Sequence, residues 1–311
     1  MRRMAALGTY AVFRAVGSAM RHAPEPLVEV VGSAVAGRLA GRRTAAGAQY
    51  ARHLQRVLGS EIDEVAVRDW TRRAFRNYAR YWAEGARLPS LPAEVIRDRM
   101  RVESGFEHLA GAMSSGRGAI LALPHIGSWE WGGAWLSLEG YPMTTVAEVL
   151  QPPELFAWFV AQREKLGLTI VPLCPGSGGV LLRTLRAGGL VGLLCDRDLQ
   201  GNGIEIEFFG ERTTLPGGPA TLALRTGAAL LPTAVYSGPG RHHTAVVLPE
   251  VDVRRDKGLR QDVERITQDL ARALETLIRR APDQWHLFQP NWPSDRAAPP
   301  HDRDRSVDRA P

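Results

Sequence analysis

The sequence is poor in cysteine, in lysine and in long apolar runs. Its two cysteines among 311 residues, Cys174 and Cys195, lie far apart and have the spacing of neither metal ligands nor a disulfide framework. A disulfide-stabilised fold is therefore excluded, and we expect a reducing, cytoplasmic compartment and no metal site. No stretch approaches the roughly 18 continuous apolar residues of a membrane-spanning helix. The N-terminus lacks the apolar core and cleavage site of a signal peptide.

Nearly all of the positive charge comes from arginine. Lysine and arginine number 39 against 33 acidic residues, for a net charge of +6, and the lysines are Lys165 and Lys257 alone. Such a balance favours an anionic partner, either nucleic acid or an anionic membrane surface. Because the basic residues are spread over several expected helices without a recognised nucleic-acid motif, we predict no nucleic-acid partner. A non-catalytic protein that binds a membrane surface through its arginines stays an alternative to an enzyme.

Residues 1–92 are expected to form a helical, membrane-associating portion, with helices over 27–43, 45–58 and 65–88. The stretch before Pro24 also fits an amphipathic helix. Its apolar positions are Met4, Leu7, Tyr10, Ala11 and Phe13, and its basic positions are Arg2, Arg3, Arg14 and Arg21. Such a helix either lies on a membrane with its arginines at phosphate headgroups or packs on the protein with its arginines in solvent, and the pattern leaves both open.

From residue 93 to residue 293 strands and helices alternate. The expected strands are 99–103, 119–123, 143–148, 169–173, 190–195, 204–209, 229–236 and 244–248. The expected helices include 105–115, 152–166, 180–187, 219–226 and 261–280. This alternation predicts an α/β fold with a mainly parallel central sheet flanked by helices. The tail 294–311, rich in proline, aspartate and arginine, is expected to be disordered.

The stretch 117–136 carries the strongest chemical signal. It reads RGAILALPHIGSWEWGGAWL and places His125 where an apolar strand meets a helix, with Glu130 in the first helical turn. In open α/β sheets, ligands bind beyond the carboxyl ends of the strands. A histidine whose tautomer is fixed by a carboxylate can take a proton from an alcohol that attacks a carbonyl, as acyl transfer requires. The alternative for an isolated His-x4-Glu pattern is a histidine that hydrogen-bonds a turn beside a solvated acid.

Two further stretches carry charged residues that could act with His125, and the first of them is expected at the same edge. Asp196, Arg197 and Asp198 directly follow the apolar strand 190–195. Arg163 lies where a helix leads back into a strand, and its guanidinium could hold a carbonyl oxygen or a phosphate.

Taken together, these segments make the chain resemble the bacterial lipid A biosynthesis acyltransferase family, and within it the actinobacterial phosphatidylinositol mannoside acyltransferases. The segments that carry the resemblance are ALPHIGSWEWGG at 122–133, QREKLGL at 162–168, CDRDL at 195–199, EIEFFGERTTLPGGPATLALRTGA from 205 and APDQWHLFQPNW at 281–292. The resemblance is consistent with the α/β fold predicted above.

The resemblance implies that His125 is the base that deprotonates a sugar hydroxyl, which then attacks the thioester of a fatty acyl donor. It also implies that Asp196 orients His125. Glu130 replaces the aspartate that is commoner in mannoside acyltransferases and matches the lipid A branch. Since both acids are predicted at one sheet edge, the spacing leaves open which of them is the partner of His125. We favour Asp196 as the orienting acid and Glu130 as an acid that supports the site without contacting His125. We expect substrate contacts from Arg163, Arg197, Asp198 and Glu205.

The partners implied are acyl-CoA as co-substrate and an anionic glycolipid acceptor, with no cofactor and no metal. The expected location is the cytoplasmic face of the inner membrane, where the protein is peripheral. An acyl carrier protein is the alternative donor, and a lipid A-type lipid or a glycerolipid is the alternative acceptor. An apolar channel bounded by the N-terminal helices is expected to take the chain, and His286 is expected to pack near the site. Acyl length, acceptor hydroxyl and oligomeric state stay unassigned.

Overall fold

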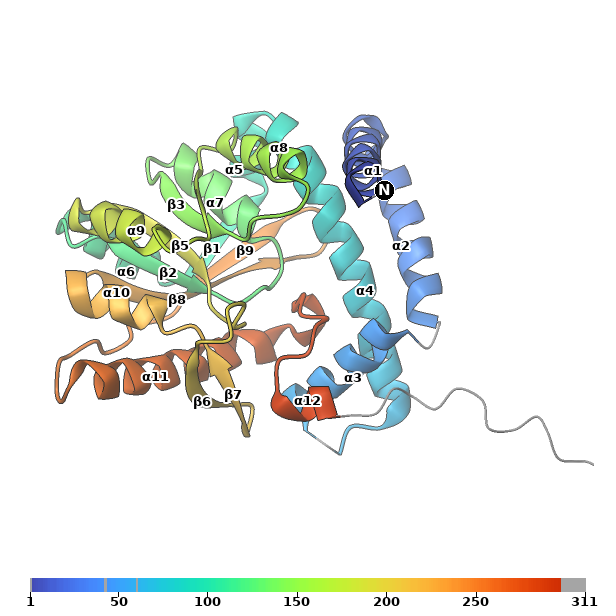
Figure 1. The fold of residues 1–311 in the computed structure, drawn as a ribbon. Coiled ribbons are helices and arrows are strands. Elements are labelled where there is room, and N and C mark those ends of the chain that lie inside the picture. Colours follow the sequence, from blue (N-terminus) through green and yellow to red (C-terminus); the bar gives the residue numbers. More distant parts are fainter. Residues whose placement is uncertain (1, 42–43, 60, 298–311) are drawn as a thin grey trace, which may run out of the picture.

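The computed structural model describes residues 2–41, 44–59 and 61–297, without the side chains of 2–7, 9, 25, 26, 29, 33, 36, 39–41 and 297. Figure 1 shows a group of helices standing beside an α/β part. The helices of the first group are α1 (Arg2–His22), α2 (Glu25–Gly41), α3 (Ala45–Leu58) and α4 (Glu64–Arg87), followed by the 3-10 turn η1 (Leu88–Ser90) and by α5 (Ala93–Asp98). Thr44 and Asp63 begin α3 and α4 as N-caps, because their side chains accept backbone N–H groups of the first turn.

A seven-stranded sheet forms the centre of the α/β part. Its strands are β1 (Met100–Ser104), β2 (Ala119–Leu123), β3 (Met143–Ala147), β4 (Thr169–Pro172), β5 (Leu190–Leu194), β8 (Ala229–Ser237) and β9 (His243–Val247), in the spatial order β1-β9-β8-β2-β5-β3-β4. All pairs are parallel except β8 with β9. The prediction of a mainly parallel sheet is therefore confirmed. β9 reverses direction because the connection 238–242 is too short for a crossover helix.

Helices cover both faces of this sheet. One face packs on α9 (Ser177–Arg186), α10 (Gly218–Thr226) and α11 (Leu259–Arg280), and the other packs on α5, α6 (Phe106–Ser114) and α7 (Trp129–Leu138). In β2, Ile120 and Ala122 enter the first core, whereas Leu121 and Leu123 enter the second. Alternate side chains of a strand face opposite sides, so a strand covered twice is apolar throughout.

α1 has both a packed and an exposed side. Phe13 contacts Trp82 of α4 and Phe159 of α8 (Pro153–Glu164), and Arg21 donates to Gln162 at 2.7 Å. Val12 is 61% exposed. Of the predicted amphipathic positions, the side chains of Arg2, Arg3, Met4 and Leu7 lie outside the described residues. Phe13 therefore packs on the protein, whereas Arg21 is bound by α4 and α8 instead of lying in solvent, where the packed interpretation expects it.

Two smaller elements complete the fold. The antiparallel hairpin β6 (Ile204–Phe208) and β7 (Glu211–Leu215) stands apart from the main sheet, and β7 was not predicted. The described part of the chain then ends with the 3-10 turn η2 (Pro282–Gln284) and α12 (Pro293–Ala297).

The expectation of disorder from residue 294 is wrong for 294–297, which belong to α12. Asp295 is buried there among polar groups of α3. Composition alone missed this because the partners of Asp295 are remote in sequence. The rest of the expected tail, 298–311, lies outside the described residues.

Candidate active site

His125 and Asp196 lie side by side because they follow two neighbouring strands in matching register. Leu123 of β2 pairs with Leu194 of β5, and the Cys195 N–H continues the ladder to Leu123 O at 2.8 Å. Each polar residue lies two positions beyond its paired leucine. Both side chains therefore reach the same carboxyl edge of the sheet, where α/β folds bind ligands.

The Asp196 carboxylate is completely buried and accepts three hydrogen bonds. Oδ1 accepts from His125 Nδ1 at 2.6 Å, and Oδ2 accepts from the His125 N–H at 2.9 Å and from Trp285 Nε1 at 2.6 Å. An ionised carboxylate can only accept, so Nδ1 carries the imidazole proton and Nε2 keeps its lone pair. In the neutral ring, Nε2 is thus the nitrogen of His125 that can accept a proton.

The surroundings of this pair favour an ionised Asp196. Burial raises the pKa of Asp196, but the charge and hydrogen bond of His125 and the hydrogen bond of Trp285 outweigh burial and hold that pKa below its usual value. Burial lowers the pKa of His125, yet the Asp196 carboxylate raises it above its usual value, against a smaller lowering by Arg197. The His125 side chain is 31% exposed, so a substrate can reach the imidazole.

The backbone after His125 is fixed between β8 and the C-terminal segment. The Gly127 φ is +57°, and a Cβ there would lie 2.0 Å from Val235 O, so this close approach requires glycine. The His286 N–H donates to His125 O at 2.7 Å, and its Nε2 donates to Gly127 O at 3.0 Å. Burial lowers the pKa of His286 to about 3, so the ring is neutral. His286 therefore packs beside the site, as expected.

Glu130 belongs to a separate polar group beside this pair. Its Oε1 accepts from Tyr81 Oη at 2.9 Å and from Arg163 Nη2 at 2.8 Å. The Arg163 guanidinium lies over the rings of Trp129 and Phe159. Burial and the nearby Glu130 charge raise the pKa of Tyr81 well above its usual value, so its hydroxyl remains a donor. Glu130 Oε2 and Arg163 Nε are buried without a hydrogen-bond partner among the described residues.

The geometry distinguishes the two candidate partners of His125. Asp196 contacts the imidazole directly, whereas Glu130 holds Arg163 and affects His125 only through its charge. The short aspartate side chain reaches the imidazole because the backbone of Asp196 directly follows the paired end of β5.

Of the other residues predicted to contact substrate, Arg197 lies near His125, whereas Asp198 and Glu205 lie in and after the loop that leads to β6. Arg197 lies near enough to His125 for its charge to lower the pKa of the imidazole. Asp198 accepts hydrogen bonds from three N–H groups of the loop before β6 and from Thr214. These hydrogen bonds stabilise the conformation of the loop. Glu205 is exposed on β6, where it pairs with Arg212 at 3.1 Å. For all three, contact with a substrate stays a prediction.

Three residues of the site were not assigned from sequence: Tyr81, Trp285 and Asn291. Tyr81 and Trp285 donate to Glu130 and Asp196, and Asn291 Nδ2 donates to Asp196 O at 3.0 Å. The signal available was the motif at 281–292, which contains both Trp285 and Asn291 without indicating what they contact.

Two cavities lie near the site. A narrow apolar cavity of about 30 Å³ lies between the sheet and helices α6 and α7, and Leu123, Trp129, Gly133 and Val235 help to line it. A larger cavity of about 260 Å³ lies between α2, α4 and the β8–β9 turn and is lined by the arginines 76, 80, 87, 99 and 241. The N-terminal helices therefore border the arginine-lined cavity, and the apolar cavity lies within the α/β part.

Within the described ranges, no helix is long and apolar enough to cross a membrane. Among the residues that the structure describes, no group of three or more histidine, cysteine, aspartate or glutamate side chains could hold a metal ion. The arrangement at His125 can accept a proton from a hydroxyl group, as acyl transfer to an alcohol requires.

Comparison with known proteins places this site in a family. The model of the bacterial lipid A biosynthesis acyltransferases matches residues 2–294. The chain belongs to this family. As a family member it is an acyltransferase, and its His125 motif lies within the matched region.

Two actinobacterial proteins are among the curated relatives to which this acyltransferase is similar in sequence. The chain is 38% identical over 280 residues to the phosphatidylinositol mannoside acyltransferase of Mycolicibacterium smegmatis, which covers 89% of this chain and 88% of the relative. It is 41% identical over 252 residues to that of Mycobacterium tuberculosis, covering 79% and 77%. Similarity to the lipid A biosynthesis acyltransferase of Haemophilus influenzae is lower, 24% over 185 residues, covering 58% and 55%.

Proposed function

We propose that this acyltransferase moves a fatty acyl chain from acyl-CoA to a sugar hydroxyl of a phosphatidylinositol mannoside, with His125 as general base. The 2.6 Å contact between His125 Nδ1 and Asp196 Oδ1 is the observation that carries the mechanism. The choice of acceptor is supported by the names of the relatives at 38–41% identity.

In the proposed reaction the acceptor hydroxyl gives its proton to His125 Nε2 as its oxygen attacks the thioester carbonyl. The tetrahedral intermediate then collapses, the C–S bond breaks, and the imidazolium returns the proton to the leaving CoA sulfur. Asp196 stabilises the imidazolium through Nδ1, and such a base contributes about 10²-fold to 10⁴-fold in rate. Because a thioester already has a good leaving group, positioning and one base suffice.

Glu130 and Arg163 are proposed to bind the polar end of a substrate. Both carry a buried polar atom without a partner among the described residues. Such atoms are costly unless a ligand or water pairs with them. Arg163 can donate to a carbonyl or phosphate oxygen, whereas Glu130 can accept from a sugar hydroxyl.

The apolar cavity behind Trp129 is proposed to begin the path of the acyl chain. Its lining is almost entirely apolar, and it starts beside the helix that carries Glu130. At about 30 Å³ it has room for little more than one or two water molecules, so a long chain requires its walls to separate.

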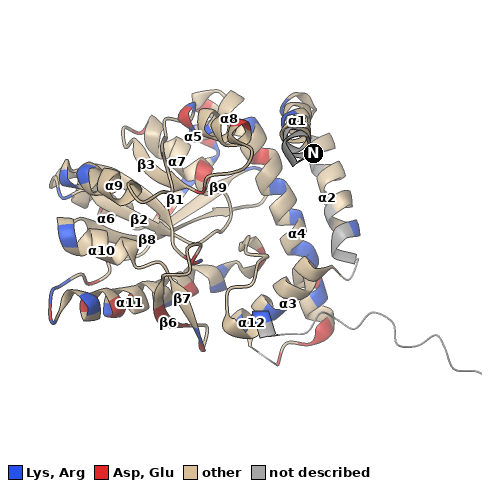
Figure 2. Ribbon diagram, viewed as in Figure 1, with Lys and Arg blue, Asp and Glu red and all other residues tan. Residues whose placement is uncertain are grey.

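Helices α1 and α2 are proposed to associate with the cytoplasmic face of the membrane. They lie on the side of α4 that is away from the sheet (Figure 1), and α2 carries only three charged residues in its sequence. Figure 2 shows the contrast with α4 and α11, along which charged residues recur. Val30 and Val31 are 65% and 52% exposed, an apolar surface suited to the lipid boundary.

Vesicle sedimentation tests the membrane proposal. Val30→Asp combined with Val31→Asp should release the protein from phosphatidylinositol-containing vesicles. The matched control is Val65→Asp, because Val65 is 60% exposed at the start of α4. Equal release by both changes would contradict the assignment of this surface.

Thiol release from palmitoyl-CoA tests the reaction. Release should require a phosphatidylinositol mannoside and should disappear in His125→Ala, while His242→Ala, at an exposed histidine of the β8–β9 turn, should behave as wild type. A lipid A-type glucosamine lipid is the comparison acceptor, since the family model includes that branch. Turnover with the glucosamine lipid and none with the mannoside would show that the assigned acceptor is wrong. Full activity of His125→Ala would overturn the mechanism.

A further inference from the structure

The segment 284–295 holds the His125–Asp196 pair from behind the site. Trp285 Nε1 and Asn291 Nδ2 donate to the Asp196 side chain and carbonyl at 2.6 Å and 3.0 Å. The His286 N–H donates to His125 O at 2.7 Å. The positions of both members of the pair therefore depend on where this segment lies.

One buried carboxylate fixes the end of this segment. The Asp295 side chain is completely buried, and its Oδ2 accepts the N–H groups of Asn291 at 3.0 Å and Trp292 at 3.2 Å. These two hydrogen bonds close the turn that carries the Asn291 amide toward Asp196. Trp292 is buried against Phe208, to whose carbonyl it donates at 3.2 Å.

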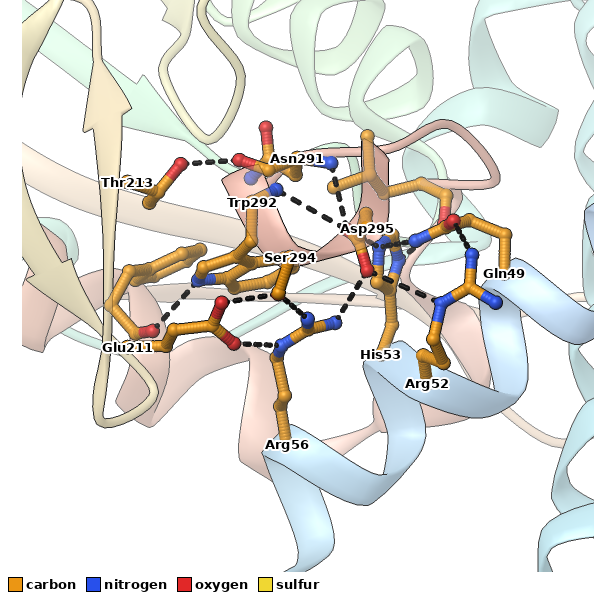
Figure 3. Close-up of polar contacts among 12 residues, drawn as sticks. Gln49, Arg52, His53, Arg56, Glu211, Thr213, Asn291, Trp292, Ser294 and Asp295 are labelled. Atoms are coloured by element: carbon orange, nitrogen blue, oxygen red, sulfur yellow. Dashed lines mark hydrogen bonds and ion pairs between the residues drawn. The ribbon is translucent and has the colours of Figure 1, made fainter. Parts of the chain in front are cut away.

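Helix α3 holds Asp295 from the other side, as Figure 3 shows. Arg56 Nη1 and Arg52 Nε lie 2.9 Å and 3.3 Å from Oδ1, and His53 Nε2 lies 3.4 Å from Oδ2. His53 Nδ1 also lies 3.0 Å from Leu287 O, in the middle of the segment. These residues share one face of α3, as spacings of three and four residues allow.

The hairpin β6–β7 joins the same cluster. Glu211 accepts from Arg56 Nε at 2.7 Å and from the Ser294 hydroxyl, and Thr213 donates its hydroxyl to Asn291 O (Figure 3). Because the chain runs from Asp196 into this hairpin, the cluster is connected to the site from two directions.

We propose that Asp295 is a positioning residue for acyl transfer, through which α3 fixes the C-terminal segment and thereby keeps Asp196 on His125. The proposal rests on the proposed function in taking His125 as the base. It also gives a role to the motif at 281–292, most of which has no direct part in the reaction.

Charge supports this role. Burial raises the pKa of Asp295, but hydrogen bonds from His53, Gln49 and the N–H groups of Asn291 and Trp292 outweigh burial and hold the pKa far below its usual value. The lowered pKa favours the ionised form, in which Asp295 keeps its contacts with the arginines of α3. A neutral side chain of the same size would lose the ion pairs and retain the volume.

The pKa of His125 reports whether the pair is intact. The charged and titratable groups that face His125 are Asp196 and Arg197 after β5, Glu130 on α7 and His286 in the C-terminal segment, with Tyr81 and Arg163 behind Glu130. Asp196 raises this pKa, so a longer distance between the two side chains lowers it. The neutral imidazole is the active base, and the acid limb of the kcat profile then moves to lower pH.

The experiment compares Asp295→Asn and Asn291→Ala by NMR titration of His125, assigned with His125→Ala, and by the pH profile of kcat with palmitoyl-CoA and a phosphatidylinositol mannoside. Both variants should lower the pKa of His125 and reduce kcat about 10-fold to 100-fold, with KM for palmitoyl-CoA little changed. Asn291→Ala removes no charge, so its shift cannot come from lost long-range attraction. The double variant should shift no further than the larger single change, because both act through one turn.

Asp69→Asn is the matched control, since Asp69 forms an exposed ion pair with Arg72 on α4. Arg52→Gln, at a side chain that is 35% exposed, supplies a milder change at the same cluster if Asp295→Asn does not fold. A lower melting temperature with an unmoved pKa of His125 and an unmoved acid limb would overturn the proposal. The titration needs no acceptor, so it tests the positioning role even if the assigned acceptor is wrong.

Discussion

Two buried carboxylates at one edge of the sheet have opposite surroundings. Asp196 accepts three hydrogen bonds through both oxygens, and its position is fixed from β2 and from the C-terminal segment. Glu130 uses only Oε1, and its Oε2 is buried without a partner in the described part of the chain. A carboxylate whose two oxygens both accept hydrogen bonds within the protein is suited to orient a base. A carboxylate with one oxygen left without a partner is suited to bind a substrate hydroxyl. The difference supports the proposed orienting role of Asp196 and the proposed binding role of Glu130.

The comparison predicts that Asp196→Asn has the largest effect, a fall in kcat of about 10²-fold to 10⁴-fold. The amide cannot stabilise the imidazolium and can fix the wrong tautomer. Because the Asp196 charge raises the pKa of His125, its removal should lower that pKa. The residual activity should therefore reach its plateau at a lower pH than in wild type, as a kcat profile would reveal. An acid limb that moved upward would contradict the proposed charge relationship.

Glu130→Gln should act mainly on binding. It removes the charge that faces Arg163 while keeping the side-chain volume, and a hydrogen bond to a charged group contributes about 1.5–3 kcal/mol, or roughly 10-fold to 100-fold. We expect KM for the mannoside to rise more than kcat falls. Steady-state kinetics with varied acceptor would decide, and the matched change Glu139→Gln, at an exposed ion pair with Arg97, should be neutral. Loss of kcat alone would assign Glu130 to the chemical step.

Trp285→Phe should remove one of the three hydrogen bonds that the Asp196 carboxylate accepts, without removing its charge. With one donor fewer, the pKa of Asp196 rises, because hydrogen bonds to the ionised form lower it. We expect a fall in kcat of about tenfold or less, since the two donors of His125 remain. The matched control is Trp70→Phe, at a partly buried tryptophan of α4 whose ring faces Arg73. Equal losses in the two variants would show that Trp285 acts through packing alone.

Gly133→Ala should have the smallest effect and should depend on acyl length. Its Cβ would lie 3.0 Å from Leu168 and Met143 in the wall of the apolar cavity. Overpacking of this kind costs about 1 kcal/mol, partly offset by the higher helix propensity of alanine. Thiol release from palmitoyl-CoA should therefore fall relative to octanoyl-CoA. An unchanged ratio would place the acyl path elsewhere.

The elements of the α/β part were predictable because their periodicity is local. β2 was predicted at its observed bounds, 119–123, and α3 at 45–58. The short α5, β7 and α12 were missed, since short polar elements depend on distant partners. Asp295 illustrates this, because its burial depends on arginines that lie far away in α3.

The site was predictable as a set of residues and not as an arrangement. His125, Glu130 and Asp196 lie at the expected edge, because His125 and Asp196 follow strands and Glu130 begins a helix. Arg163 lies in the last turn of α8, and its contact with Glu130 was not predicted. Which acid contacts His125 depended on the register of β2 and β5, which no spacing along one chain contains. Trp285 and Asn291 join the site only because the C-terminal segment folds back on it.

The sequence by itself determined the fold class, the strand ends and the residue types available for acyl transfer, because hydrophobic period and turn residues act over short distances. The resemblance implied the pairing of His125 with Asp196, and the tertiary structure decided it by the register of β2 and β5. The tertiary structure alone decided the pairing of Glu130 with Arg163 and the burial of Asp295. Each of these depends on hydrogen bonds between segments whose relative position is set by packing rather than by local conformation.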